Sequence, residues 1–423
     1  MTIERDSDRL IVAAGTVLSG YLDRSQVKRD TSIYSYQAVP PKNAVSLIMP
    51  VRRDPYLWQQ GVHPIFEMNL PEGELRQALI RKFAKVQARF DDFDLLSIVG
   101  PHQLGRVTVL KPEMDNNGAP MAMRDLLHYA GTEDLVEYLL STYAPYSGVS
   151  GVQPKVLMRD PETEGVDRLT QRTATHIVKA WRDDQYPQLA ANEYFCLLAA
   201  RSAGLPVPDF DLSDDGRLLI IKRFDLPVDG TYLGFEDLCA LNGWLSNRKY
   251  EGSYEHCAKQ LRTFVSPDRR RSAMEQFYAS LVLSCVLQNG DAHRKNFGVL
   301  YSNAADDADV WIAPTYDIVT TTAYIPKDAL ALLLAGSKRW PKERILRQFG
   351  RTACDLSAGS VAVIMERIGD GIATARAALT AYARDNPPFQ PVAEKMLQAW
   401  NCGQKQSLLD ERRPMVSLGS NMH

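Results

Sequence analysis

The sequence predicts an α+β fold with two lobes: a β-rich lobe with an added N-terminal subdomain, and an all-helical C-terminal lobe. Short apolar segments with strand character (KVLM, THIVKAW and RLLIIKRF) lie between residues 150 and 225. From Glu236 onward apolar residues recur at helical spacing instead. The first hundred or so residues mix both patterns, which favours a separate subdomain. We therefore divide the chain into residues 1–118, 119–235, 236–410 and a polar tail over 411–423 that we expect to be flexible.

The N-terminal subdomain is expected to combine strands with one long helix. Leu10–Leu22 and Thr31–Tyr36 have strand character, the second with clear apolar/polar alternation. Glu74–Phe90 shows the spacing of a helix that packs one face on a sheet. The strand Arg106–Leu110 leads into the turn-rich KPEMDNNGAP, where we place the first boundary. No candidate catalytic cluster precedes it, so we expect this subdomain to dock without doing chemistry.

The remaining elements are mostly helical. Asn192–Ala203 is predicted to be a helix closed by Gly204, a residue suited to a helix C-terminus. Further helices are predicted over Tyr254–Phe264, Ser272–Gln288, Lys342–Phe349 and Ser360–Tyr382. Of these four, the second is apolar on nearly every side, so we expect it to be buried.

Composition gives no global case for a nucleic-acid or membrane partner. The 423 residues are 45% hydrophobic and 24% charged, with a net charge of −2. The six cysteines are scattered without a CxxC pair, which argues against a zinc site and favours free thiols in a reducing compartment. The longest apolar run, residues 279–287, is far below the ~20 residues of a membrane span, and the charged N-terminus does not resemble a signal peptide. We expect a cytoplasmic protein.

A cluster of polar residues, NGDAHRKN, follows the helix that we expect to be buried. Gly290 is suited to a left-handed cap at the end of that helix. Asp291 comes next, and alone it would be interpreted as a turn or cap residue. Asn296 follows five residues later, and Asp317 lies twenty-one residues further on, in the apolar-flanked APTYDIV. An Asp, an Asn at this spacing and a later Asp form the phosphotransfer set of the protein-kinase superfamily, so the predicted fold is protein-kinase-like.

This set assigns a role to each residue. Asp291 would accept or orient the proton of the attacking hydroxyl, while Asn296 and Asp317 would hold Mg²⁺ on the phosphates of ATP. Mg²⁺ prefers hard oxygen ligands and keeps several waters, so an amide and a carboxylate suffice. Lys295 would lie near the transferring phosphoryl group, where a cation offsets developing charge. An Asp followed by an Asn five residues later also occurs by chance. The prediction of a phosphotransfer site therefore rests on the combination of Asp291, Asn296 and Asp317.

Other segments could complete an ATP site. Lys179 ends the apolar strand THIVK, where it could contact a phosphate or reach water at a strand edge. Glu193 could pair with Lys179, as kinases arrange such residues, or face solvent. The loop Tyr146–Lys155 could cradle phosphates through backbone N–H groups, although taken alone it is simply a loop. In Ile220–Asp225 an apolar strand leads into the second lobe, where a hinge would offer backbone groups to adenine.

These motifs together resemble a known family. SGVQPK, THIVK, NEYFCLLAARSAGLPVPD, KRFD, NGDAHRKNFGV and YDI resemble the HipA family of serine/threonine kinases, the toxins of bacterial toxin–antitoxin pairs. NAVSLIMP, PIFEMNLPEG and FDLLSIVG resemble the HipA N-terminal subdomain. The resemblance covers most of the chain.

The resemblance implies a set of site residues. It makes Asp291 the catalytic base and places Mg²⁺ on Asn296 and Asp317. The nucleotide-binding residues that it implies are Ser150, Gly151, Val152, Gln153, Pro154 and Lys155 in a phosphate loop, Lys179, the hinge residues Lys222, Arg223 and Phe224, the catalytic-loop residues His293, Arg294, Lys295 and Asn296, and Tyr316 with Asp317.

The resemblance also implies regulation. In this family a serine just ahead of the GxQxK segment is autophosphorylated, which expels the loop and switches the kinase off. Relatives carry serine at the position of Gly148, at that of Ser150, or at both. This sequence keeps only the second, with Ser147 as a rival site. Pro154, where some relatives have Glu, changes the loop locally without removing a catalytic group.

The leading interpretation is an ATP-dependent protein serine kinase toxin. The resemblance suggests an aminoacyl-tRNA synthetase as its substrate and a HipB-like helix-turn-helix antitoxin as its partner. The sequence contains no convincing helix-turn-helix of its own, so operator DNA would be reached only through the antitoxin. The alternatives are a non-catalytic nucleotide-binding co-repressor and a small-molecule kinase on the same fold.

Overall fold

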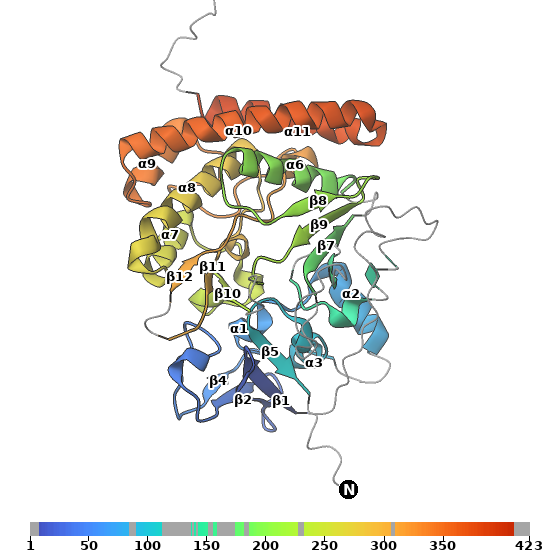
Figure 1. Cartoon of the computed structure of the whole chain (residues 1–423), viewed down its shortest axis with the longest axis vertical. Coiled ribbons are helices and arrows are strands. Elements are labelled where there is room, and N and C mark those ends of the chain that lie inside the picture. Colours follow the sequence, from blue (N-terminus) through green and yellow to red (C-terminus); the bar gives the residue numbers. More distant parts are fainter. Residues whose placement is uncertain are drawn as a thin grey trace, which may run out of the picture.

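The computed structural model describes residues 8–83, 90–111, 137, 139–140, 143–150, 155–158, 174–181, 186–226, 232–305 and 309–409 (Figure 1). These residues form three antiparallel sheets, with most of the helices gathered at one end of the molecule. Figure 1 shows the N-terminal sheet at one end, helices α10 (Ala358–Asp385) and α11 (Gln390–Ser407) at the other, and the remaining sheets between them.

The N-terminal domain is a five-stranded sheet with the order β4-β3-β2-β1-β5. Its elements are β1 (Arg9–Ala14), β2 (Val17–Arg24), β3 (Ser32–Tyr36), β4 (Tyr56–Trp58), α1 (Pro64–Glu67), α2 (Gly73–Phe83), α3 (Asp92–Val99) and β5 (Val107–Leu110). The strands predicted over 31–36 and 106–110 are confirmed as β3 and β5. The strand character predicted over 10–22 is confirmed as the hairpin of β1 and β2, in which Gly15 turns the chain in the left-handed region with φ 67°. Helix α3, which was not predicted, begins at a capping box of Asp91 with Asp94.

The second sheet has the order β6-β7-β9-β8 and carries helix α6. Its elements are β6 (Lys155–Met158), β7 (His176–Ala180), α6 (Leu189–Ser202), β8 (Phe210–Leu212) and β9 (Leu218–Lys222). The three predicted strands of this lobe and its helix are therefore confirmed. Gly204 closes α6 in the left-handed conformation, with φ 72°.

The C-terminal lobe is mainly helical, but it is not all-helical as predicted. Its helices are α7 (Tyr254–Phe264), α8 (Arg270–Val286), α9 (Glu343–Thr352), α10 and α11. Its sheet consists of β10 (Gly234–Asp237), β11 (Gly298–Tyr301) and β12 (Val310–Ile312). The boundary expected between residues 235 and 236 falls inside β10, which pairs with β11 and so belongs to this lobe. The boundary expected at 118/119 lies outside the described residues.

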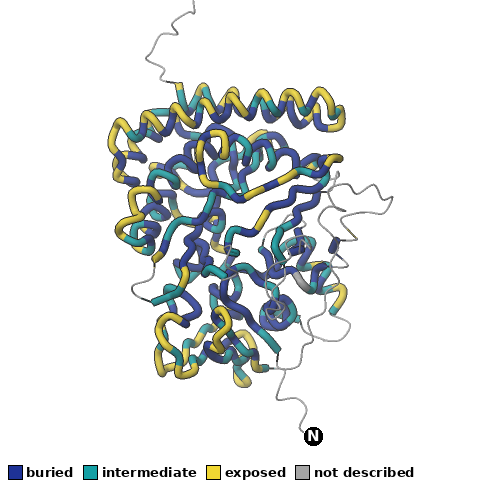
Figure 2. The backbone as a smooth tube through the Cα atoms, in the orientation of Figure 1, coloured by how far each residue is buried: buried dark blue, intermediate teal, exposed yellow. Residues whose placement is uncertain are grey.

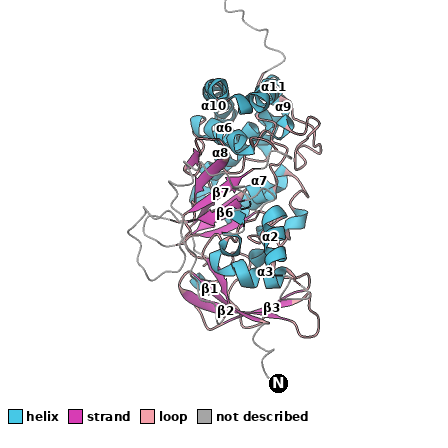
Figure 3. Cartoon of the chain, turned by 90° about the vertical axis from the view of Figure 1, so that its right-hand side faces the viewer, coloured by secondary structure: helices cyan, strands magenta, loops and turns pink. Residues whose placement is uncertain are grey.

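Two large apolar cores hold these parts together (Figure 2). One fills the helical lobe, where α10 and α11 lie over α6 and α8, as Figure 3 shows from the side. The other runs from Leu10 and Val12 of the N-terminal sheet to Val156, Val178 and Ile220 of the second sheet. The N-terminal domain therefore shares its core with the β-rich lobe.

Candidate active site

The loop over 289–296 leaves a helix that runs through the centre of the helical lobe. All residues of Phe277–Val286 are buried, as their apolar character predicts. Gln288, rather than Gly290, adopts the left-handed conformation after the helix, with φ 53°. The predicted cap at Gly290 is therefore wrong. The absence of a side chain at Gly290 instead avoids a steric clash, because a Cβ at this position would lie only 2.1 Å from Asp328 Oδ2.

Asp291 is fixed through its backbone and contacted by a tyrosine at its side chain. Its N–H donates to Asn289 Oδ1 at 3.1 Å, and its Oδ1 accepts a 2.6 Å hydrogen bond from the Tyr250 hydroxyl. Incomplete hydration at this half-exposed position raises the pKa of Asp291 to about 6, and the hydrogen bond from Tyr250 opposes the rise. Asp291 is thus mostly ionised at neutral pH and can accept a proton.

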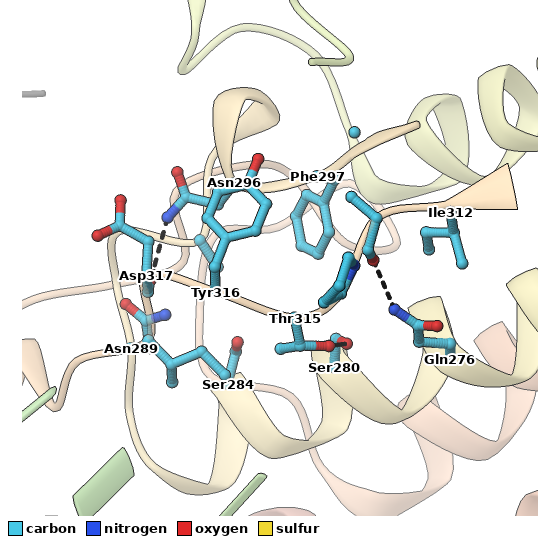
Figure 4. A pocket seen from close by; sticks show the side chains of 15 residues that line it. Gln276, Ser280, Ser284, Asn289, Asn296, Phe297, Ile312, Thr315, Tyr316 and Asp317 are labelled. Atoms are coloured by element: carbon cyan, nitrogen blue, oxygen red, sulfur yellow. Dashed lines mark hydrogen bonds between the residues drawn. The ribbon is translucent and has the colours of Figure 1, made fainter. Parts of the chain in front are cut away.

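Asn296 joins Asp291 to Asp317. Its Nδ2 donates to the backbone carbonyl of Asp291 at 3.0 Å and to that of Asp317 at 3.2 Å. Figure 4 shows Asn296 beside Asp317 at the edge of a small cavity of about 20 Å³, which has room for about one water molecule. Both amide hydrogens of Asn296 are used, so its Oδ1 can serve a cation, and within the described residues no hydrogen bond reaches this oxygen.

Lys179 forms the centre of a buried ionic network. Its Nζ lies 2.6 Å from Asp317 Oδ1 and 2.6 Å from Glu193 Oε1, so the predicted pairing with Glu193 is confirmed. Burial disfavours the charged form of Lys179, but the two carboxylates outweigh it and raise its pKa. Burial likewise opposes ionisation of Asp317, yet Lys179 and Lys155 hold the pKa of Asp317 below its usual range. Asp317 also adopts a left-handed φ of 59°, a conformation that occurs at functional sites when the surroundings impose it.

Lys155 adds a second buried cation to this network. It pairs with Lys179 across β6 and β7, and its side chain is buried. Among the residues that the structure describes, no carboxylate lies within ion-pair distance of its Nζ. Burial and the charge of Lys179 both lower the pKa of Lys155. Two neighbouring buried lysines of which one has no carboxylate partner form a site that suits an additional anion.

The basic residues of the loop over 289–296 make hydrogen bonds with other segments of the protein or are buried. The buried Arg294 donates from Nε to the Glu251 carbonyl at 2.7 Å and from Nη1 to Gln260 Oε1 at 2.5 Å. Lys295 Nζ donates to the Met68 carbonyl at 2.8 Å and to a serine hydroxyl. His293 is buried, which lowers its pKa to about 3 and keeps the ring neutral. Their assignment as nucleotide contacts remains a prediction.

The predicted hinge lies where β9 ends. Lys222 is exposed, whereas the buried Arg223 pairs with Asp225 at 2.6 Å. Phe224 packs against Tyr316 with a ring-centroid distance of 5.6 Å. Tyr316 itself donates to the backbone carbonyl of a catalytic-loop residue at 2.7 Å. The hinge segment and the catalytic loop are thus in one connected cluster.

The two candidate regulatory serines differ in their surroundings. Ser147 is fully buried; its hydroxyl donates to the Tyr143 carbonyl and accepts a hydrogen bond from the Leu157 N–H. Ser150 is only partly buried and donates to Glu72 Oε1 at 2.6 Å. Gly151, Val152, Gln153 and Pro154 of the predicted phosphate loop lie outside the described residues.

Two residues of this site were not identified from the sequence. Tyr250 contacts the candidate base, and Glu72 brings a carboxylate of the N-terminal domain to Ser150. Glu72 lies within PIFEMNLPEG, but no local pattern marked it, because its partner lies 78 residues away. The N-terminal domain therefore reaches the candidate site with a charged side chain.

Among the described helices, none combines the length and apolar character that crossing a membrane requires. The same part of the chain contains no cluster of three His, Cys, Asp or Glu side chains that could hold a metal ion.

Comparison with known proteins identifies relatives over most of the chain. The family described as "HipA N-terminal domain" matches residues 10–110, and "HipA-like C-terminal domain" matches residues 147–378. Two curated relatives from Sinorhizobium fredii, named "Putative kinase Y4dM" and "Putative kinase Y4mE", are 28% and 27% identical over 66% of this chain and over 67% and 69% of their own lengths.

A solved structure extends the likeness to the fold. HipA of Shewanella oneidensis MR-1, in complex with HipB and its operator DNA, is 18% identical and superposes with a TM-score of 0.69 over 94% of this chain and 97% of its own. This likeness confirms the predicted two-lobed α+β fold. The match of the C-terminal family to more than half of the residues shows that this chain belongs to the HipA family.

Proposed function

We propose that this chain is an ATP-dependent protein serine/threonine kinase and the toxin of a toxin–antitoxin pair. The observation that carries the proposal is the convergence of Asp291, Asn296 and Asp317 beside the ion pair of Lys179 with Glu193. Membership of the HipA family and the two relatives named as kinases support it.

Each side chain has a role in this proposal. The Asp291 carboxylate accepts the proton of the acceptor hydroxyl as the hydroxyl oxygen attacks the γ-phosphorus of ATP, the bond from that phosphorus to the β,γ-bridging oxygen breaks and ADP leaves. Asn296 Oδ1 and the Asp317 carboxylate are hard oxygen donors that would hold Mg²⁺, which neutralises phosphate charge when bound. Lys155 and Lys179 supply positive charge for the phosphate oxygens, and Lys155, which has no carboxylate within ion-pair distance among the described residues, gains a counter-ion when the nucleotide binds.

The partners follow from the same proposal. A HipB-like antitoxin would bind this chain and provide its contact with operator DNA, as in the complex of the Shewanella HipA with HipB and DNA. The protein substrate would be a component of translation, with an aminoacyl-tRNA synthetase as the first candidate. We further propose that Ser150, rather than the fully buried Ser147, is autophosphorylated, since only Ser150 can leave its contact without disrupting buried backbone hydrogen bonds.

Phosphotransfer by the purified protein tests this function. Wild-type protein incubated with Mg²⁺, radiolabelled ATP and a bacterial extract should label protein bands, whereas a small-molecule kinase would label a metabolite and a co-repressor would label nothing. Asp291→Asn should slow transfer by about 10²–10⁴-fold, the effect of a lost general base, with ATP binding largely retained. Asp309→Asn, which changes an exposed carboxylate paired with Arg269, is the matched control. Wild-type rates in the Asp291→Asn protein would contradict the assignment.

A further inference from the structure

Glu72 is the point at which the N-terminal domain meets the candidate active site. It lies between α1 and α2, yet its carboxylate contacts side chains of the other two lobes. Oε1 accepts the 2.6 Å hydrogen bond from the Ser150 hydroxyl, and Oε2 accepts a 2.9 Å hydrogen bond from Lys249 Nζ. Lys295 Nζ lies 3.7 Å from Oε1. One carboxylate therefore connects Ser150 to the segment before α7 and to the catalytic loop.

Two lysines lie against the Glu72 carboxylate. Among the described residues, Lys249 and Lys295 lie within ion-pair distance of Glu72. Lys295 also lies 3.9 Å from the Asp237 carboxylate, and Glu67 accepts hydrogen bonds from Ser246 in the same region. Lys295 therefore divides its charge between Glu72 and Asp237.

Glu72 remains ionised in this setting. Burial alone would raise its pKa, but Lys295, Lys249 and the hydrogen bond from Ser150 hold the pKa of Glu72 at about 2. A permanent negative charge therefore lies at hydrogen-bond distance from the Ser150 hydroxyl.

We infer that Glu72 is a positioning residue that holds unmodified Ser150 in place and repels Ser150 once it is phosphorylated. This inference rests on the proposed kinase function. Transfer of the γ-phosphoryl group of ATP to Ser150 Oγ replaces the hydroxyl hydrogen, giving ADP and a proton. Ser150 thereby loses the hydrogen that it donates to Glu72, and gains a charge of about −2 beside the carboxylate. The hydrogen bond between Ser150 and Glu72 is thereby replaced by a contact between like charges.

The consequence reaches the nucleotide site through the chain itself. Ser150 precedes β6, whose first residue, Lys155, faces Lys179 and the Asp317 carboxylate. When Ser150 leaves Glu72, the backbone hydrogen bond from the Gly148 N–H to the His102 carbonyl remains, but the side-chain contact nearer to Lys155 is lost. We therefore expect phosphorylation to weaken nucleotide binding because of Glu72.

A double-mutant cycle measures this coupling. All proteins carry Asp291→Asn so that they remain free of self-transferred phosphate, and binding of Mg²⁺ with a non-hydrolysable ATP analogue is measured by calorimetry. Ser150→Asp, which places a negative charge next to Glu72, should weaken binding about 10- to 100-fold in the otherwise unchanged protein. Glu72→Gln keeps the size of the side chain and removes its charge. In that background Ser150→Asp should weaken binding of the ATP analogue by less than about threefold.

Glu67→Gln is the matched control, because Glu67 belongs to the same interface but contacts Ser246 rather than Ser150. In the Glu67→Gln background, Ser150→Asp should weaken binding of the ATP analogue by the same factor as in the parent protein. Equal penalties in the Glu72→Gln and Glu67→Gln backgrounds, or no penalty in the parent, would overturn the role of Glu72 while leaving the kinase proposal intact. Failure of the parent protein to bind the analogue at all would instead overturn the proposed function.

A second variant keeps the inference testable if Glu72→Gln does not fold. Lys249→Met removes one of the two cations that offset Glu72, so the penalty of Ser150→Asp should grow at least severalfold. A penalty that stays the same in Lys249→Met would overturn the inference independently.

Discussion

At the scale of single residues, the hydrogen bond between Tyr250 and Asp291 controls how the candidate base is presented. The ring of Tyr250 is exposed, and its hydroxyl donates to Asp291 Oδ1 at 2.6 Å. Arg294 fixes the segment that carries Tyr250, because its backbone N–H donates to the Lys249 carbonyl and its side chain to the Glu251 carbonyl. Tyr250 therefore holds one carboxylate oxygen and leaves the other for the acceptor hydroxyl.

Tyr250→Phe should lower kcat about tenfold, since hydrogen bonds to charged groups typically contribute about 1.5–3 kcal/mol and a freed carboxylate samples unproductive orientations. The Kd for ATP should stay unchanged, because the Tyr250 hydroxyl contacts Asp291 rather than Lys155 or Lys179, the lysines proposed to bind phosphate. Steady-state kinetics together with equilibrium binding separate the two effects. Tyr186→Phe is the control, as Tyr186 is equally exposed but packs on Tyr324. An increase in kcat would show that Tyr250 blocks the acceptor position instead.

At the scale of secondary-structure elements, the contact between α10 and α6 supports the lobe that carries the catalytic loop. The two helices approach closely at Gly371, where a Cβ would lie 2.5 Å from the Ala203 backbone nitrogen and 2.6 Å from its Cβ. Gly369, in the same helix, has its nearest neighbour at 3.8 Å. The two glycines therefore differ in packing but share the same helical environment.

Gly371→Ala should lower the free energy of unfolding by about 1–3 kcal/mol, because a methyl group would force the helices apart in a packed core. Gly369→Ala should be neutral or stabilising by up to about 1 kcal/mol, since alanine favours the helix over glycine. Urea unfolding of both variants measures the difference. Equal stabilities would show that α10 can shift on α6 without cost.

At the scale of the whole molecule, buried polar contacts tie the N-terminal domain to the C-terminal lobe. The Glu236 carboxylate in β10 accepts hydrogen bonds from Ser46 Oγ at 2.7 Å, from the Leu47 N–H at 2.8 Å and from the Tyr301 hydroxyl at 2.7 Å. Burial raises the pKa of Glu236 to about 7, although these donors oppose the rise. The folded protein therefore retains a proton that the unfolded chain releases near pH 4.3.

This difference predicts how stability changes with pH. Between about pH 4.3 and 7 the folded state binds more protons than the unfolded state, so Glu236 makes the free energy of unfolding fall as pH rises, by up to about 4 kcal/mol. Glu236→Gln removes this dependence. The Tm of the variant minus the Tm of wild type should therefore be more positive at pH 8 than at pH 5. Thermal unfolding at both pH values, with Glu275→Gln on the exposed face of α8 as control, measures it. A difference in Tm that is the same at both pH values would contradict the assignment.

The sequence identified those parts of the site whose signal is local. Asp291, Asn296 and Asp317 were found because a polar loop follows a uniformly apolar helix, and Lys179 because a lysine ends an apolar strand. The strands of the β-rich lobe and helix α7 were predicted for the same reason, since the spacing of apolar residues reflects which face is buried. The strands β10, β11 and β12 escaped prediction because each is only three or four residues long and because β10 pairs with β11, which lies far along the chain.

The sequence by itself determined the fold class, the order of the candidate catalytic groups and the resemblance to the HipA family. Only the tertiary structure decided that Tyr250 contacts Asp291, that Glu72 reaches Ser150 and that Lys295 turns toward the N-terminal domain. The physical reason is distance along the chain. Hydrogen bonds and ion pairs between residues 41, 78 or 227 positions apart leave no periodicity in the sequence and exist only once packing has brought their elements together.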